Sequence, residues 1–263
     1  MQHMPYDKVI SQLNIKKGDA LLVSSDIKKF MWNSLKQKEK FDIQHFIDTL
    51  TDAVGEEGTL IFPTYNWDFC KGVPFDYVKT PGKTGALGVA ALKRSDFKRS
   101  KHPLYSCAIW GKDKEMLCER DYRSSFGEDS IFAYLHEMKG KNLLLDVTLQ
   151  HCFTYAHYVE QQSGVVSYRY LKQFTADYID ANGERQKKTY EMFVRDLNLD
   201  VINLIDPYEE DFLENGIAEV KYINDSKFFL IELDPAYRII LDDIKNHSSR
   251  KLCSYIGQNV EKN

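Results

Sequence analysis

The chain has 263 residues, of which 43% are hydrophobic and 28% charged, and its formal net charge is −4. This composition is typical of a folded protein that is long enough to bury a sizeable core, and the acidic balance argues against a nucleic-acid partner. No apolar stretch approaches the ~18 residues of a membrane span, so we expect no membrane partner either.

The N-terminal segment and the cysteines predict the compartment. The sequence MQHMPYDKVI at the N-terminus lacks the apolar run of a secretion signal. The five cysteines are irregularly spaced and include no Cys-x-x-Cys pair, so they predict no disulfide framework. We therefore expect a cytoplasmic protein whose thiols stay reduced.

The first part of the chain alternates between helical and strand patterns. The expected elements are a helix at 5–13, a strand at 20–23, a helix at 42–54 and a strand at 59–62. Alternation of this kind predicts an α/β fold with a mixed, partly parallel central sheet that is flanked by helices.

A turn-rich stretch follows at residues 65–82. Loops of this length are uncommon unless they are functional or disordered, and the aromatic residues in this one argue against disorder. The elements expected after it are a helix at 85–95, a strand at 106–110, a helix at 130–138 and a strand within 141–147.

The pattern becomes less regular from residue 165 onward. The Asn182-Gly183 pair predicts the turn of a β-hairpin between two strand-like runs. We expect a helix over 191–216 and strands over 218–232. No repeat, low-complexity segment or linker is present, so the chain is predicted to be a single domain over residues 1–263, with this hairpin and helix region at its C-terminal end.

Residues 149–162, LQHCFTYAHYVEQQ, follow directly after the predicted strand that contains Leu143-Leu144-Leu145. Ligands bind beyond the carboxyl ends of strands in open α/β sheets, so this position favours a functional site. If residues 152–162 form one helix, His157 and Glu160 share a face with Phe153.

Four interpretations of this stretch remain open. It can be a half-buried helix in which His157 is hydrogen-bonded to Glu160, or a metal site to which His151 adds a ligand. It can also carry a nucleophilic Cys152, or His157 as a general base. Zinc needs three or four ligands and no second cluster supplies the rest, so we expect no metal. On an uninterrupted helix Cys152 and His157 point about 140° apart.

The order of five motifs adds a resemblance. TLIFPTYNWDF, KTPGKTGALGVAALKR, KRSKHPLYSCAIWG, SSFGEDSIFAYL and TYAHYVE, in this order, resemble the aminoglycoside 3-N-acetyltransferase family from about Gly18 to Arg169. The resemblance implies an acyl-CoA-dependent N-acyltransferase that acts on the amine of an amino sugar. It implies acyl-CoA as a co-substrate and needs no metal.

The resemblance also implies roles for residues. His157 would be the base, oriented by Glu160 or by its rival Asp146, because a histidine titrates near the operating pH. The residues expected on the cofactor side are Ser25, Lys28, Thr64, Gly85, His102, Tyr105 and Ser106. Those expected on the acceptor side are Tyr65, Asp68, Thr154 and His151.

Departures from the family pattern leave the acceptor open. Val23-Ser24-Ser25-Asp26 lacks the family's histidine, and Leu145-Asp146 and Gln150-His151-Cys152 also differ from it. The acceptor is therefore an aminoglycoside or a nucleotide-linked amino sugar. Two alternatives stay beside this hypothesis: a ping-pong acyltransferase that uses Cys152, and a non-catalytic module that binds CoA and a sugar. A second copy of this chain is also a candidate partner, in a homo-dimer.

Overall fold

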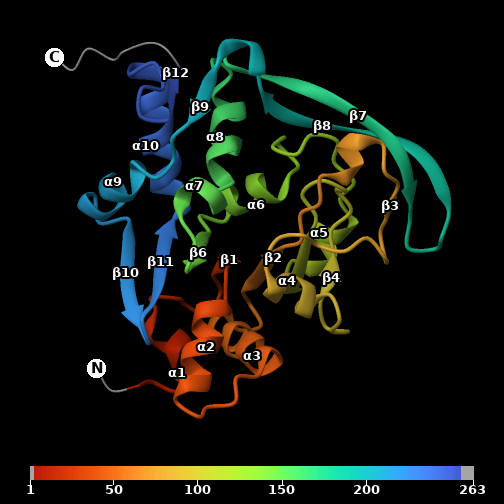
Figure 1. The fold of residues 1–263 in the computed structure, drawn as a ribbon. Helices are drawn as coiled ribbons and strands as arrows, with labels where there is room; N and C mark the ends of the chain where they lie inside the picture. Colours follow the sequence, from red (N-terminus) through yellow and green to blue (C-terminus); the bar gives the residue numbers. More distant parts are fainter. Residues whose placement is uncertain (1–2, 256–263) are drawn as a thin grey trace.

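A seven-stranded sheet forms the centre of the computed structural model, which describes residues 3–255 (Figure 1). Its strand order is β10 (Ala218–Ile223), β11 (Ser226–Glu232), β6 (Lys141–Leu145), β1 (Ala20–Ser25), β2 (Thr59–Pro63), β5 (Cys107–Gly111) and β4 (Lys98–Arg99). β1 pairs in parallel with both β6 and β2, whereas the outer pairs are antiparallel. This confirms the expected mixed, partly parallel sheet.

Helices cover both faces of this sheet. Those that pack on one face are α1 (Tyr6–Val9), α2 (Lys28–Lys36), α3 (Ile43–Val54) and α4 (Ala86–Ala91). Those on the other are α5 (Lys114–Glu119), α6 (Ile131–Glu137), α7 (Leu149–Cys152), α8 (Tyr155–Ser163), α9 (Tyr208–Glu214) and α10 (Leu233–Asn246). Alternate residues of β1 enter the two cores: Leu21 lies in the first and Leu22 in the second. A strand buried on both faces explains the continuous apolar run in its sequence.

The predicted helix over 42–54 is α3, and its ends have local causes. The Asp42 carboxylate accepts hydrogen bonds from the backbone N–H groups of Gln44 (2.8 Å) and His45 (3.3 Å). Gly55 ends the helix with a φ of 68°, a conformation that a glycine adopts without strain. The apolar positions between these ends pack against the sheet, so this helix agrees with its sequence pattern.

A long hairpin extends from the side of the main sheet (Figure 1). Its strands β7 (Arg169–Ile179) and β8 (Arg185–Arg195) pair over their whole length, and β3 (Phe75–Asp76) pairs with β7. Gly183 has a φ of 84° in the connecting turn, which confirms the hairpin predicted around Asn182-Gly183. A separate pair is formed by β9 (Val201–Asn203) and β12 (Cys253–Tyr255).

The prediction of a helix over 191–216 is wrong. β8 continues to Arg195, a short 3-10 turn spans Leu197–Leu199, β9 follows, and only α9 is helical. Pairing with β7 outweighs the local helical preference at the start of this region. Asp200, with a φ of 47°, interrupts any helix in the middle, and α9 begins only after Pro207.

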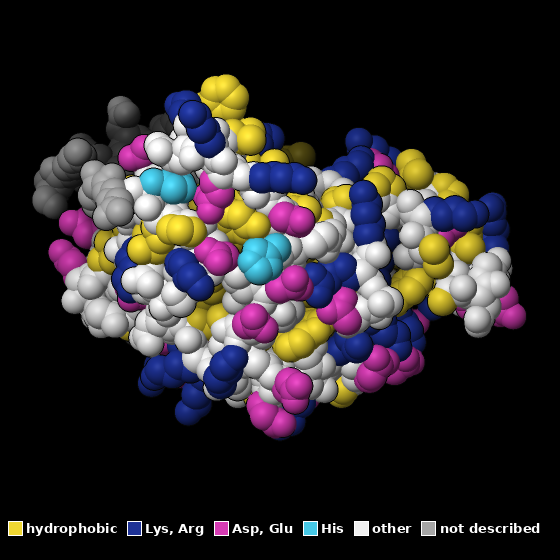
Figure 2. All heavy atoms as spheres, turned by 90° about the horizontal axis from the view of Figure 1, so that it is seen from below, with side chains coloured by type: hydrophobic (Ala, Val, Ile, Leu, Met, Phe, Trp, Pro, Cys, Tyr) yellow, Lys and Arg dark blue, Asp and Glu magenta, His cyan; other side chains and the backbone are white. Residues whose placement is uncertain are grey.

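The surface of the described part of the chain carries mixed charge. The face in Figure 2 shows acidic and basic side chains interspersed with hydrophobic ones. No helix among residues 3–255 combines the length and the apolar character that crossing a membrane requires.

We expect Asp42→Ala to lower the free energy of unfolding by about 1 kcal/mol, because two N–H groups at the start of α3 lose their acceptor. Urea denaturation measures this change. Asp52→Ala, at an exposed position of the same helix, is the control and should change stability by much less. Equal effects of the two substitutions would contradict a capping role.

Candidate active site

A pocket of about 260 Å³ lies beyond the carboxyl ends of β1 and β2, where the sequence predicts a ligand site. Seven of the predicted site residues line it: Ser25, Tyr65, Gly85, Tyr105, His151, Thr154 and His157. The other lining residues are Val23, Ser24, Pro63, Trp67, Thr84, Leu87, Gly88 and Cys152. The pocket therefore joins the strand ends, the 65–88 region and the α7–α8 segment.

The segment with His157 consists of two helices, which corrects the single helix expected over 152–162. α7 ends at Cys152, and Phe153 has a φ of −86° and a ψ of 63°, which is outside the helical region. Phe153 is buried against Phe212 with ring centroids 5.7 Å apart, so it does not share a face with His157. The 140° separation does not apply across this break, and both Cys152 and His157 line the pocket.

A buried carboxylate holds the His157 ring. Its Nδ1 lies 2.6 Å from Oε2 of Glu160, a side chain with no exposed surface. The Tyr168 hydroxyl (2.9 Å) and the Asn203 amide (3.0 Å) donate to Oε1 of Glu160. Nε of Arg169 lies 2.8 Å from Oε2. Glu160 is thus fixed by groups from two further segments of the chain, residues 168–169 and β9.

These contacts set the protonation states. Burial lowers the pKa of His157, and the Arg169 charge lowers it further against the opposing effect of Glu160. Burial opposes ionisation of Glu160, but His157, Arg169 and Tyr168 outweigh it and hold the pKa of this carboxyl below its usual range. His157 is therefore neutral at neutral pH, with Nδ1–H donated to the carboxylate and Nε2 left as the basic atom. Its side chain is 23% exposed, and it lines the pocket.

Asp146, the rival orienting carboxylate, lies elsewhere. Its Oδ1 accepts the backbone N–H of Lys227 at 2.8 Å and is 3.8 Å from Nζ of Lys29. It does not line the pocket, and the contact to His157 is made by Glu160.

Thr64 and Ser106 lie beneath the pocket rather than in its wall. Both are fully buried, and their hydroxyl oxygens are 3.0 Å apart. The Ser106 hydroxyl also accepts from Nε of Arg99 at 3.1 Å. They therefore join the residue that follows β2 to the residue that precedes β5, next to the last pair of these two strands.

His102 is also buried away from the pocket. Its Nδ1 accepts the backbone N–H of Tyr105 at 3.2 Å, and its ring stacks on Tyr122 with centroids 5.0 Å apart. Burial lowers the pKa of His102 to about 3. Its position thus supports the chain that carries Tyr105 into the pocket.

Two predicted charged residues remain at the surface. Lys28 is exposed, with Nζ 3.5 Å from Asp26, and the Asp68 carboxylate is paired with Lys83 at 2.5 Å. Neither side chain lines the pocket.

Close backbone packing forms the floor of the pocket. A Cβ on Gly88 would lie 2.4 Å from the carbonyl oxygen of Pro63, and one on Gly85 would lie 3.3 Å from that of Ser25. Gly85 also has a φ of 76°. These glycines let the start of α4 approach the ends of β1 and β2.

Three aromatic residues form one wall. The ring of Tyr105 lies 4.8 Å from Tyr65 and 6.1 Å from Trp67, in both cases edge to face. Trp67 is 39% exposed, so this wall continues to the mouth of the pocket. Such a wall suits an apolar sugar face or an acyl chain.

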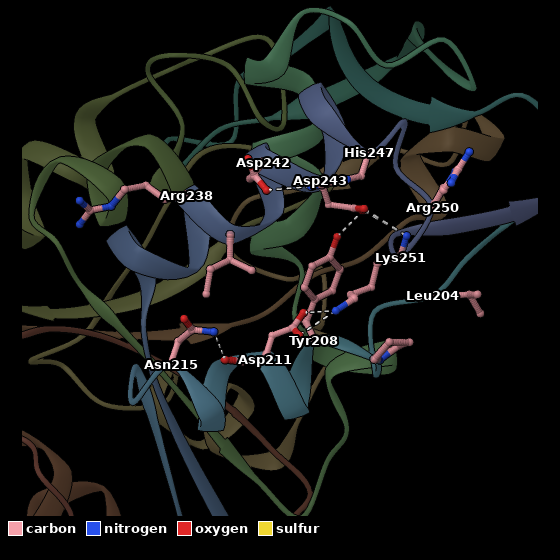
Figure 3. Close-up of a pocket in the computed structure, with 12 residues that line it drawn as sticks. Leu204, Tyr208, Asp211, Asn215, Arg238, Asp242, Asp243, His247, Arg250 and Lys251 are labelled. Atoms are coloured by element: carbon pink, nitrogen blue, oxygen red, sulfur yellow. Dashed lines mark hydrogen bonds and ion pairs between the residues drawn. The ribbon is translucent and has the colours of Figure 1, made fainter. Parts of the chain in front are cut away.

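A larger cavity of about 890 Å³ lies between α9 and α10 (Figure 3). Its polar groups are largely paired with one another. The Tyr208 hydroxyl donates to Asp243 at 2.7 Å, and Nζ of Lys251 lies 2.6 Å from Asp211. Its histidine, His247, lies 3.3 Å from Asp242, but both side chains are more than half exposed. Because no buried carboxylate holds this ring, we place the active site at the smaller pocket.

The residues that sequence reasoning missed are those behind Glu160. Asn203 is 43 positions away from Glu160, and nothing in its local sequence indicates the contact. Within residues 3–255 no group of three or more His, Cys, Asp or Glu side chains is arranged to hold a metal ion.

Comparison with known proteins finds one matching family. The family model described as aminoglycoside 3-N-acetyltransferase matches residues 22–243. The aminoglycoside N(3')-acetyltransferase-like protein YokD, derived from the SPbeta prophage of Bacillus subtilis (strain 168), is 29% identical over 174 residues. That alignment covers 57% of this chain and 62% of YokD, so the chain spans less than two thirds of this relative.

Solved structures share the fold over nearly the whole chain. The YokD crystal structure has a TM-score of 0.74 at 21% identity and 94% coverage of both chains. AAC-IIIb in a binary complex with CoASH has a TM-score of 0.75 at 19% identity, with 92% of this chain and 95% of that chain covered. AAC-VIa bound to sisomicin has a TM-score of 0.74 at 16% identity, with 94% and 99% covered.

We expect Arg169→Met to raise the pKa of His157, because the cation that disfavours imidazolium is lost while Glu160 stays beside the ring. The imidazole NMR resonances, followed over a pH titration, measure this. Arg169→Lys keeps the charge and should move the pKa less. An unchanged titration in the methionine variant would contradict the electrostatic role of Arg169.

We also expect stability to fall with acidification because of His102. The buried ring stays neutral down to about pH 3, whereas in the unfolded chain it takes up a proton below its ordinary pKa of 6.5. The unfolded state then binds more protons, so stability is lost as the pH falls, by up to about 1.4 kcal/mol per pH unit within this window. Urea unfolding at pH 4 to 7 should show a smaller slope for His102→Asn than for the wild type. Identical slopes for the two proteins would exclude His102 as a source of the pH dependence of stability.

Proposed function

Because this chain belongs to the aminoglycoside 3-N-acetyltransferase family, we propose that it transfers an acyl group from acyl-CoA to the amine of an amino sugar. The observation that carries the proposal is His157, a neutral histidine at the pocket wall whose Nδ1 is held by the buried Glu160. We propose the whole chain as one domain and the cytoplasm as its compartment.

The reaction follows from these protonation states. The neutral amine of the acceptor attacks the thioester carbonyl carbon, while Nε2 of His157 takes up a proton from the amine nitrogen. Glu160 stabilises the imidazolium that forms. The tetrahedral intermediate then breaks its C–S bond, and the CoA thiolate receives the proton from His157. The products are an amide and CoASH.

The oxyanion of the intermediate needs hydrogen-bond donors. The hydroxyls of Thr64 and Ser106 are buried and engaged with each other, so they are poor candidates. Main-chain N–H groups around the pocket are the better ones.

The acyl-CoA side is proposed at the strand ends. Ser25 and Gly85 line the pocket there, and the similar structure of AAC-IIIb was solved with CoASH. The exposed ammonium of Lys28 lies outside the pocket, where it would meet the CoA phosphates.

The acceptor side is proposed at the aromatic wall and the α7–α8 break. Tyr65, Thr154 and His151 line this part, and the similar structure of AAC-VIa contains sisomicin. The amine would be presented to His157 by an aminoglycoside or by a nucleotide-linked amino sugar.

The ping-pong alternative rests on Cys152, which also lines the pocket. Burial raises the pKa of this thiol, which keeps it protonated and weakly nucleophilic. In the described structure the hydrogen bond of His157 goes to Glu160, not to Cys152. Direct attack by the amine is therefore favoured.

We expect His157→Ala to lower kcat about 10²- to 10⁴-fold, because the amine loses its proton acceptor. The assay is CoASH release from acetyl-CoA with a panel of amino sugars, and circular dichroism checks the fold. A kcat of His157→Ala equal to that of the wild type would rule out the role of His157 as the base.

The variant Cys152→Ala distinguishes direct attack by the amine from a route through an acyl-cysteine intermediate. Retained turnover, with no acyl adduct in the mass spectrum of the wild type, is expected for direct attack. A wild-type protein that binds CoA but never releases it from acetyl-CoA would point instead to a binding module.

A further inference from the structure

The pocket wall carries no formal charge. None of the described residues that line it is Asp, Glu, Lys or Arg, and its two histidines are the only titratable nitrogen groups in it. His157 is held neutral, as described above. A cationic ligand would therefore find no anionic partner on this wall.

Two carboxylates next to residues of the wall are already paired with cations. Glu160 lies behind His157 and is paired with Arg169. Asp68, on the turn after Trp67, is 2.5 Å from Lys83.

Two further carboxylates lie near the end of β1. Asp26 faces Lys28 at 3.5 Å, and Asp146 faces Lys29 at 3.8 Å. Each is thus offset by a lysine that is itself at the surface. Neither carboxylate is therefore free to pair with an ammonium group in the pocket. The acidic side chains of Asp206, Glu209, Glu210 and Glu214 line a separate hollow beside Thr148.

The dimensions agree with a small acceptor. The volume of about 260 Å³, which the acceptor would share with the acyl end of acyl-CoA, lies below the roughly 300–1,000 Å³ typical of pockets for drug-sized ligands. The edge-to-face cluster of Tyr65, Trp67 and Tyr105 offers apolar surface for one sugar ring. It can also attract a single ammonium group through its π faces.

Polyamines are disfavoured in such a site. Each ammonium that loses its water shell without gaining an anionic partner costs binding free energy. An aminoglycoside carries several ammonium groups at neutral pH, whereas the reaction uses only one amine.

We propose that the acceptor is a single amino-sugar ring with one amino group, and that polycationic aminoglycosides are poor substrates. This inference rests on the proposed function and specifies its acceptor. The observations behind it are the uncharged wall, the paired carboxylates around it and the small volume.

The first experiment compares acceptors with acetyl-CoA as the donor. The probes are methyl glycosides of mono-amino hexoses, the same sugars linked to a nucleoside diphosphate, and sisomicin. We expect kcat/KM for the best mono-amino sugar to exceed that for sisomicin at least 100-fold. The two mono-amino arms show whether the ring alone or its nucleotide-linked form is recognised.

The outcomes separate the two proposals. If sisomicin is turned over as well as the best mono-amino sugar, the acceptor class is wrong and the acyltransferase function stands. If no amine releases CoASH, the acyltransferase function fails and the acceptor class falls with it.

A matched pair of variants tests the charge argument directly. His151 is exposed and lines the pocket, so His151→Asp adds a carboxylate there, and His151→Asn adds a similar volume without charge. We expect kcat/KM for sisomicin to be at least fivefold higher in His151→Asp than in His151→Asn, with the difference shrinking as salt is added. Equal values for the two variants would show that the charge of the pocket does not exclude polycations, and would overturn the inference.

Discussion

The site depends on the burial of one negative charge. Glu160 has no exposed surface, and an ionised carboxylate in that position is stable only with a countercharge and hydrogen-bond donors. Arg169, Tyr168 and Asn203 supply them. Removal of one partner from a buried ion pair typically costs about 3–5 kcal/mol. The region after α8 therefore supports the candidate active site, although its residues lie outside the pocket.

This constraint links the hairpin to the chemistry. Arg169 is the first residue of β7, and its guanidinium also donates to the Phe193 carbonyl on β8 (3.0 Å) and to the Asn203 side chain on β9 (2.6 Å). The base of the hairpin, β9 and α8 thus converge on one carboxylate. The central sheet fixes the other half of the pocket through the ends of β1 and β2.

Local signals in the sequence were sufficient for part of this structure. The helix over 42–54, the turn at Gly183 and the i, i+3 pair of His157 and Glu160 each involve neighbours in the chain, and all three are present in the structure. The motif order identified the family, and the position after β6 identified the pocket.

Other features were not predictable because they depend on distant contacts. The break at Phe153 follows from burial of its ring against Phe212 on α9, and the contact of Asn203 with Glu160 joins residues 43 positions apart in the chain. The family motifs also placed His102, Thr64 and Ser106 at the cofactor, whereas the structure buries them beneath the pocket. The helix α10 was not among the elements expected from the sequence. It was predictable, because Leu233, Ala236, Ile240 and Ile244 show helical spacing.

The break between α7 and α8 has an evolutionary consequence. His157 and Glu160 lie on one helix that starts after the break, whereas His151 and Cys152 lie on the short helix before it. Substitutions in α7 can reshape the pocket wall without rotating His157, because the interruption at Phe153 separates the two helices. A lineage with this architecture can change the residues that line one side of the pocket while the His157–Glu160 pair stays in place.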